Sequence, residues 1–303
     1  MQIIYAFKGN ESDDLGAQQR FLLKSMNSMY DLYLLSLALL MEVQVKAKDH
    51  LEKKQKKHLA TSEDKNPNRK FINNEVLMQL SQNKALQQEL ADRRINNWSL
   101  DDEYVEIVYK SMLESDIYKE YMSTELSTYK EDKAFVIDLF KNIVAPNDKI
   151  YEYIEDKNIT WIDDLPAVNT TIVKLFRKIK PTVNEAFFTP NLFKDTDDRD
   201  YAIDLLKKTI LNLSNFSNEI SSKTANWDKD RIANTDFVLL QMAICEFNKF
   251  PSIPVKVTIN EYLEIAKEYS TPKSSVFING ILDKLIKEYE TKGTLNKIGR
   301  GLM

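Results

Sequence analysis

The sequence predicts an all-α fold, and three observations support this. Glycine and proline, which interrupt regular structure, number only six and eight among 303 residues. Alternating apolar and polar runs, typical of strands, are hard to find, whereas apolar residues recur at helical spacing along most of the chain. Hydrophobic residues make up 43%, enough for a sizeable core, and the length allows two domains. The formal charge of -4 argues against gripping nucleic acid by charge alone, although it allows a local basic patch.

The first long helix is expected over residues 18–60. Its apolar residues at helical spacing are Leu22, Leu23, Met26, Met29, Tyr30, Tyr33 and Leu37. No basic segment precedes an apolar one at the start, and the longest apolar run is interrupted by Ser36, well short of the roughly 18 residues of a membrane span. We therefore expect a soluble, cytoplasmic protein. The lysine-rich end of this helix either contacts phosphate or forms a solvated end that complements the helix dipole.

The middle of the chain begins with a linker, TSEDKNPNRK, followed by a helix pair. Ser99 and Asp102 in WSLDD have the spacing of a capping box, which predicts a helix start there. A second connector, KPTVNEAFFTPNLFKDTDDRD, contains Pro181 and Pro190 and precedes a helix expected to begin near Asp198.

Two parts of the sequence repeat at a spacing of 66 residues without a gap. The aligned parts are FVIDLFK at 135–141 with YAIDLLK at 201–207, Trp161 with Trp227, and Asp164 with Asp230. Shared helical periodicity can align apolar residues by chance, but it does not also align a tryptophan and an aspartate. We therefore expect two copies of one helical hairpin, at about 133–174 and 199–240, forming a paired bundle.

The C-terminal helices are separated by prolines. A segment from Phe237 to Phe247 is apolar on almost every side, which is typical of a central buried helix. It is expected to end before Pro251 and Pro254, and the next helix to run over about 257–269.

The last helix is expected to be capped by Ser274 or Ser275. Its predicted core face consists of Ile278, Ile281, Leu282, Leu285 and Tyr289. Gly280 lies in the middle of this helix, where it costs about 1 kcal/mol relative to alanine. We expect a close neighbouring backbone to offset that cost.

Residues that carry catalytic or metal chemistry are scarce. The single cysteine, Cys245, lies in an apolar run and is expected to be a buried hydrophobe. His50 and His58 cannot share a metal without further ligands, and no phosphate-cradling glycine loop or nucleophile elbow is present in the sequence. The acidic pairs Asp163–Asp164 and Asp197–Asp198 fit helix starts better than acid–base catalysis. We expect no enzyme activity, cofactor or metal.

The last hundred residues resemble the NusB transcription antitermination family. The resemblance rests on Trp227-x3-Arg231-x4-Asp236, Glu246, and the strings IPVKVTINEYLEIAKEYS and SSVFINGILDKL, in which INE, AK and FxNGxLD follow in order. MQIIYAF is similar to the end of the family's first helix, with Tyr5 three residues after a glutamine. The match covers about 199–290, and the intervening 10–195 is far longer than in compact members, so this is an extended form.

The resemblance implies a helical adaptor rather than an enzyme. Members pair with ribosomal protein NusE, bind boxA RNA with it, and help RNA polymerase pass terminators, notably in ribosomal RNA operons. By position, Tyr5 and Asp236 match residues at the NusE contact, although Asp236 alternatively serves only the helix dipole. Lys273, Ser274 and Phe277 match the RNA-binding turn, where a lysine can meet phosphate and an aromatic can stack on a base. Alternatively, Phe277 is core and Lys273 merely solvated.

Two departures from the family concern RNA affinity. The family has an arginine-rich stretch before the first-helix tyrosine, and here only four residues precede Tyr5. Either the native start lies upstream of Met1 or this member binds RNA in a different way, and our hypothesis is the first. A position that is basic in the family is Val276 here, which predicts weak RNA binding with a shallow salt dependence.

Two other functions stay open at this point. The first is a helical protein–protein scaffold that has kept the fold and lost RNA binding. The second, a NusB-like domain of a ribosomal RNA methyltransferase, would need a glycine-rich cofactor site on an α/β domain, which the sequence lacks. The expected domains are an extended helical region at 1–198, whose first family helix is 1–9, a NusB-like domain at 199–290, and a flexible tail at 291–303.

Overall fold

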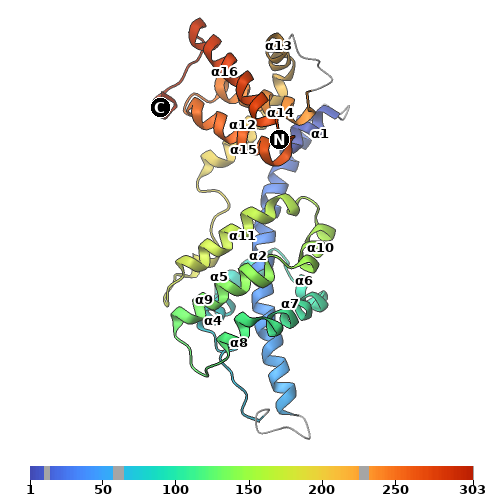
Figure 1. Cartoon of the computed structure of the whole chain (residues 1–303), viewed down its shortest axis with the longest axis vertical. Helices are drawn as coiled ribbons and strands as arrows, with labels where there is room; N and C mark the ends of the chain where they lie inside the picture. The colour runs from blue at the N-terminus through green and yellow to red at the C-terminus, as the bar shows by residue number, and fades with distance from the viewer. Residues whose placement is uncertain (10–13, 57–64, 225–231, 303) are drawn as a thin grey trace. The chain divides into compact units, whose positions relative to one another are not determined.

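The computed structural model describes residues 1–9, 14–56, 65–224 and 232–302. These ranges contain helices and no strand, so the all-α prediction is confirmed (Figure 1). The α-helices in chain order are α1 (Gln2–Gly9), α2 (Leu15–Gln55), α4 (Glu75–Gln82), α5 (Lys84–Asp92), α6 (Asn97–Leu100), α7 (Asp102–Glu114), α8 (Asp116–Tyr121), α9 (Tyr129–Leu139), α10 (Asp148–Lys157), α11 (Trp161–Lys178), α12 (Thr196–Leu211), α13 (Leu213–Lys223), α14 (Asn234–Lys249), α15 (Val255–Tyr269) and α16 (Ser274–Lys292). A π-helical turn at Phe140–Val144 continues α9, and 3₁₀ turns occur at Glu185–Phe188 and Gly299–Leu302.

The chain folds as two compact units. The terminal unit comprises Met1–Lys24 and Phe193–Met303, and the inserted unit comprises Ser25–Leu192. The expected domains, 1–198 and 199–290, stay a prediction, and the compact units differ from them in grouping α1 with the C-terminal helices. After α16, in the segment expected to be a flexible tail, the backbone N–H of Ile298 donates to the carbonyl of Pro251 at 3.0 Å.

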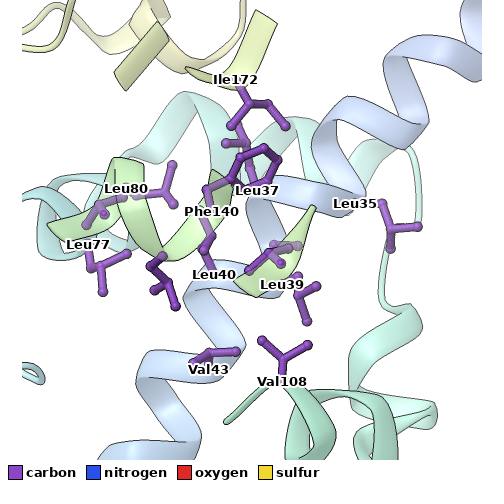
Figure 2. Packing of buried hydrophobic residues seen from close by; sticks show 14 of the residues in the cluster. Leu35, Leu37, Leu39, Leu40, Val43, Leu77, Leu80, Val108, Phe140 and Ile172 are labelled. Atoms are coloured by element: carbon purple, nitrogen blue, oxygen red, sulfur yellow. The ribbon is translucent and has the colours of Figure 1, made fainter. Parts of the chain in front are cut away.

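The inserted unit is built around the centre of α2. This part of the helix is apolar on every side, and it is almost fully buried through Leu32, Leu34, Leu35, Leu37, Leu39, Leu40 and Val43. Figure 2 shows that leucines of α4, Val108 of α7, Phe140 and Ile172 of α11 belong to the same cluster. Among the described residues, α2 alone is long and apolar enough to cross a membrane, but 67% of its most apolar window is buried inside the protein, as in a core helix.

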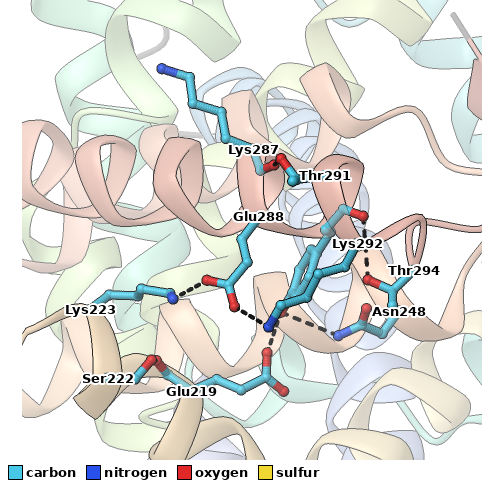
Figure 3. Close-up of polar contacts among 10 residues, drawn as sticks. Glu219, Ser222, Lys223, Asn248, Lys287, Glu288, Thr291, Lys292 and Thr294 are labelled. Atoms are coloured by element: carbon cyan, nitrogen blue, oxygen red, sulfur yellow. Dashed lines mark hydrogen bonds and ion pairs between the residues drawn. The ribbon is translucent and has the colours of Figure 1, made fainter.

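The terminal unit is built around α14. Every residue from 238 to 247 is buried, and α14 packs against α1, α12, α13, α15 and α16, so the prediction of a central buried helix is confirmed. The predicted core face of α16 is also confirmed, because all five of its residues are buried. Polar contacts hold α16 to α13: Lys223 pairs with Glu288, and the Tyr289 hydroxyl donates to Glu219 (Figure 3).

Three local predictions were wrong. Ser99 does not cap α7, because it lies inside α6 and its Oγ donates to the carbonyl of Asn96 at 2.7 Å. Neither Ser274 nor Ser275 caps α16, since the N-cap residue is Lys273 and no side chain caps that end. At Gly280, an added Cβ would meet no atom of the described residues within 4 Å beyond its own helix, so no other described backbone approaches it.

The helices reproduce the 66-residue spacing of the sequence repeat. α10 and α13 correspond at this spacing, and so do several buried positions. These are Phe140 with Leu206, Ile150 with Phe216, Ile154 with Ile220, Ile172 with Val238, and Phe176 with Met242. Trp227, Asp230, Arg231 and His58, on which other predictions rest, lie outside the described residues.

Candidate functional site

The turn between α15 and α16 is tied to the start of α14 by one carboxylate. Asp236, in the first turn of α14, is only 4% exposed. Its Oδ1 accepts from Ser270 Oγ at 2.5 Å, and its Oδ2 accepts from Ser274 Oγ at 2.8 Å. Ser274 Oγ also accepts from the backbone N–H of Thr271 at 3.1 Å. The turn is therefore held at both of its ends by a buried acceptor.

This arrangement changes the picture of two sequence-predicted site residues. By position, Asp236 is expected either at the NusE contact or as a carboxylate that serves only the helix dipole, and Ser274 is expected at the RNA-binding turn. In the structure Ser274 is 1% exposed, and both side chains use their polar atoms inside the chain. The sequence signal for this cluster is weak: two serines four residues apart on either side of Pro272.

Lys273 and Phe277 lie on the part of the turn and helix that Asp236 holds. Lys273 is exposed, and Phe277 is half-buried against the core of the terminal unit. Because the two residues are four apart at the start of α16, their side chains share one helix face. Val276 beside them is 76% exposed. The structure thus brings together an exposed cation, one partly accessible aromatic and an exposed aliphatic side chain.

Tyr5 belongs to a second region of the terminal unit, a groove between α1 and α14. Its side chain is 47% exposed. The groove has a volume of about 190 Å³ and is lined by Tyr5, Lys8, Gly9, Asn234 and Val238.

Lys8 anchors α1 beside this groove, and sequence reasoning missed it. Its Nζ donates to Gln241 Oε1 at 3.2 Å and lies 4.6 Å from the centroid of the Phe237 ring. Gln241 is buried in α14 and donates in turn to Ser217 Oγ at 2.9 Å. Burial lowers the pKa of Lys8. A lysine one turn after Tyr5 was the available signal, but its partner lies 233 residues away.

The cysteine, histidine and acidic residues considered for catalysis or metal binding lie in the following environments. Cys245 is buried, as predicted, and burial raises the pKa of its thiol to about 11. His50 Nδ1 lies 3.1 Å from the Tyr109 hydroxyl. Over the described part of the chain, no three histidine, cysteine or acidic side chains are grouped so that they could hold a metal ion. The acidic pairs of α11 and α12 do lie in the first turns of these helices, as expected.

Comparison with known proteins finds sequence similarity over the segment that contains these elements. A family model described as NusB family matches residues 170–287. The chain is 41% identical over 112 residues to the transcription antitermination protein NusB of Salinibacter ruber (strain DSM 13855 / M31), covering 37% of this chain and 70% of that protein. It is 38% identical over 121 residues to the protein of the same name from Chloroherpeton thalassium (strain ATCC 35110 / GB-78), covering 40% of this chain and 57% of that one.

A third related protein was found by sequence, and the chain was also compared with solved structures. The NusB protein of Finegoldia magna (strain ATCC 29328 / DSM 20472 / WAL 2508) is 42% identical over 92 residues, covering 29% of this chain and 67% of that protein. No solved structure gives a significant match. The family match begins within α11 and ends within α16, so most of the inserted unit lies outside it.

Proposed function

The chain belongs to the NusB family, as its motifs predicted, and we propose on that premise that it is a cytoplasmic transcription antitermination factor. Its proposed ligand is boxA-type RNA, bound together with ribosomal protein NusE within the RNA polymerase antitermination complex. The proposed role is to support transcription of ribosomal RNA. The proposal assigns the protein binding work and no covalent chemistry.

The observation that carries the RNA part of this proposal is the held turn before α16. An exposed lysine can neutralise a phosphate, and an accessible aromatic face can stack on an unpaired base, which contributes about 1–3 kcal/mol per base. Lys273 and Phe277 offer these two groups on one helix face. Val276 supplies apolar surface beside them in place of a second charge.

Asp236 and Ser274 have an indirect role in this proposal. Their buried hydrogen bonds fix the turn before any ligand arrives, so less conformational entropy is lost on binding. NusE contacts are assigned to the surface around Tyr5, where the groove between α1 and α14 is open to a partner side chain. A partner that reached Asp236 directly would have to displace Ser270.

The test is titration of labelled boxA RNA in the presence of NusE, using the full chain. Lys273→Glu should weaken RNA binding and reduce the slope of log affinity against log salt by about 0.7, the value for one phosphate contact on a single strand. Phe277→Leu keeps apolar volume but removes the aromatic face, and it should weaken binding by about 1–3 kcal/mol. Lys284→Glu is the control, because Lys284 is exposed on the same helix with the same charge.

The competing function makes a different prediction for the same titration. A helical scaffold that has lost RNA binding would retain NusE and show no boxA binding in the unmodified chain. Equal RNA affinity for Lys273→Glu, Phe277→Leu and the control would likewise contradict the assigned RNA surface while leaving the family membership intact.

A further inference from the structure

The C-terminal end of α11, in the inserted unit, carries an uncompensated positive charge. Between Asp164 and Glu185 the chain has four basic residues and no acidic one. They are Lys174, Arg177, Lys178 and Lys180, and all four are exposed. The first three lie at positions i, i+3 and i+4 of the helix, so they share one face. We call these four residues the α11 basic face.

Two half-buried cations of the inserted unit, in contrast, have acidic partners. Lys46 pairs with Asp102 and Glu106, and Arg93 pairs with Asp31 and Glu89. No ion pair joins the α11 basic face to any acidic side chain that the structure describes. Like charges four residues apart destabilise a helix by about 0.2–0.5 kcal/mol, so Lys174 and Lys178 repel each other within α11.

Stabilisation of the helix end does not account for this cluster. Cations commonly gather at a helix C-terminus because they satisfy its free carbonyls and its dipole. Here Lys133 of α9 already occupies that position, since its Nζ donates to the carbonyls of Arg177 at 2.8 Å and Ile179 at 3.1 Å. Gln79 Nε2 donates to the next carbonyls, those of Lys180 at 3.2 Å and Pro181 at 2.6 Å. The four basic side chains are therefore not needed to satisfy the carbonyls at the end of α11.

The side chains of the α11 basic face indicate which class of ligand it can bind. The apolar residues of α11 at Val168, Ile172 and Phe176 are buried in the protein's own core, so the helix has no apolar face to insert into a lipid surface. What the face offers is a row of cations, including a guanidinium that can bind phosphate through two nitrogens. A flexible polyanion with regularly spaced charges fits such a row better than a folded acidic protein, whose carboxylates lie at fixed positions.

We propose that the α11 basic face is a second RNA contact, which binds the phosphate backbone of the transcript without reading its bases. This inference rests on the proposed function, because it takes the ligand to be the same RNA strand. It adds a sequence-independent contribution to affinity that lies outside the turn at Lys273.

The experiment measures RNA affinity against salt for the full chain with NusE present. The probe is a single-stranded RNA that carries boxA and about twenty flanking nucleotides, long enough to reach beyond a single turn. The variant Lys174→Gln, Arg177→Gln, Lys178→Gln removes three charges without reversing any. Since each phosphate contact on a single strand contributes about 0.7 to the salt slope, the slope should fall by about 2.

A matched control separates a local contact from net charge. Three exposed lysines of the inserted unit already have acidic partners: Lys110, Lys119 and Lys149. Changing all three to glutamine alters the net charge equally and should leave the salt slope unchanged. If both triple variants lower the slope by the same amount, the effect is one of net charge and the inference is overturned.

Two further outcomes are informative. An unchanged slope in the α11 triple variant, with RNA still bound, overturns this inference and leaves the proposed function standing. Absence of RNA binding in the unmodified chain overturns both. Should the triple variant fail to fold, judged by its helical circular dichroism, the double variant Lys174→Gln, Lys178→Gln keeps the arginine and should lower the slope by about 1.4.

Discussion

Each unit has a buried central helix, but the two helices differ in the partners of their buried polar side chains. The centre of α2 in the inserted unit is a run of leucines, and its two buried polar side chains bond to main-chain carbonyls: Ser36 to that of Leu32 and Gln44 to that of Ile72. In α14 of the terminal unit, by contrast, three buried polar side chains each reach the side chain of another segment. These are Asp236 to Ser270 and Ser274, Gln241 to Lys8 and Ser217, and Glu246 to Tyr201.

The difference shows that a buried central helix can hold its neighbours by packing alone or can also fix their orientation through hydrogen bonds. An apolar central helix holds its neighbours by packing, which is strong and non-directional. A central helix with buried acceptors also fixes the orientation of particular turns and helix ends, because an unsatisfied polar group in the interior is costly. In the terminal unit that control extends to the turn before α16 and to α1, which carry the proposed binding residues.

The largest expected effect tests the packing role of α2. Leu37→Ala should lower the free energy of unfolding of the inserted unit by about 2–5 kcal/mol, because Leu37 is fully buried and its loss leaves a cavity. Thermal and urea unfolding would measure this. Val45→Ala in the same helix, where the side chain is 48% exposed, should change stability by less than about 0.5 kcal/mol. Equal losses for the two variants would contradict the assignment of α2 as the core helix.

The next effect tests the polar role of α14. Asp236→Ala removes the carboxylate that accepts from the buried Ser274 hydroxyl and the half-buried Ser270 hydroxyl, so it should cost about 1–3 kcal/mol of stability. Backbone amide exchange should also quicken between Ser270 and Ser274, and boxA binding should weaken. Asp197→Ala is the control, since Asp197 also lies in a helix first turn but is exposed. A loss no greater than that of Asp197→Ala would mean that Asp236 serves only the helix dipole.

A smaller effect of opposite sign is expected on α16. Gly280→Ala should raise the free energy of unfolding by about 0.5–1 kcal/mol, because glycine is a poor helix residue and an added Cβ meets nothing within 4 Å. Chemical unfolding monitored by circular dichroism would measure the gain. The same change at Gly293, whose φ is 63°, should destabilise, because alanine is strained in the left-handed region. Destabilisation at Gly280 would show that the open surface there is occupied.

The smallest effect concerns acid stability of the contacts in Figure 3. Hydrogen bonds from Lys223 and Lys292 lower the pKa of Glu288 from 4.5 to about 2. A carboxyl whose pKa is lower in the folded state stabilises the protein above its unfolded pKa, and this contribution disappears as the pH falls from about 4.5 to about 2. In Glu288→Gln the fall in melting temperature over this window should be shallower, whereas Glu290→Gln, at an exposed position of the same helix, should leave it unchanged.

The elements that the sequence predicted best are those whose signal is local. The buried α14, the proline break after it and the core face of α16 follow from apolar spacing within a single helix, and the family motifs lie in the same segment. Contacts between distant residues could not be read this way. The burial of Asp236 depends on serines more than thirty residues later, and the cap expected at Ser99 failed because a short helix, α6, formed across it.

The separation between Lys8 and Gln241 also bears on how the protein is made. These bonded side chains lie 233 residues apart, with the whole inserted unit encoded between them. At a ribosomal rate of about 5–20 residues per second, α1 emerges roughly 10 to 50 seconds before its partner helix exists. During synthesis, all residues of the inserted unit are made before α14, so this unit can fold first. Until α14 is made, the apolar face of α1 stays uncovered.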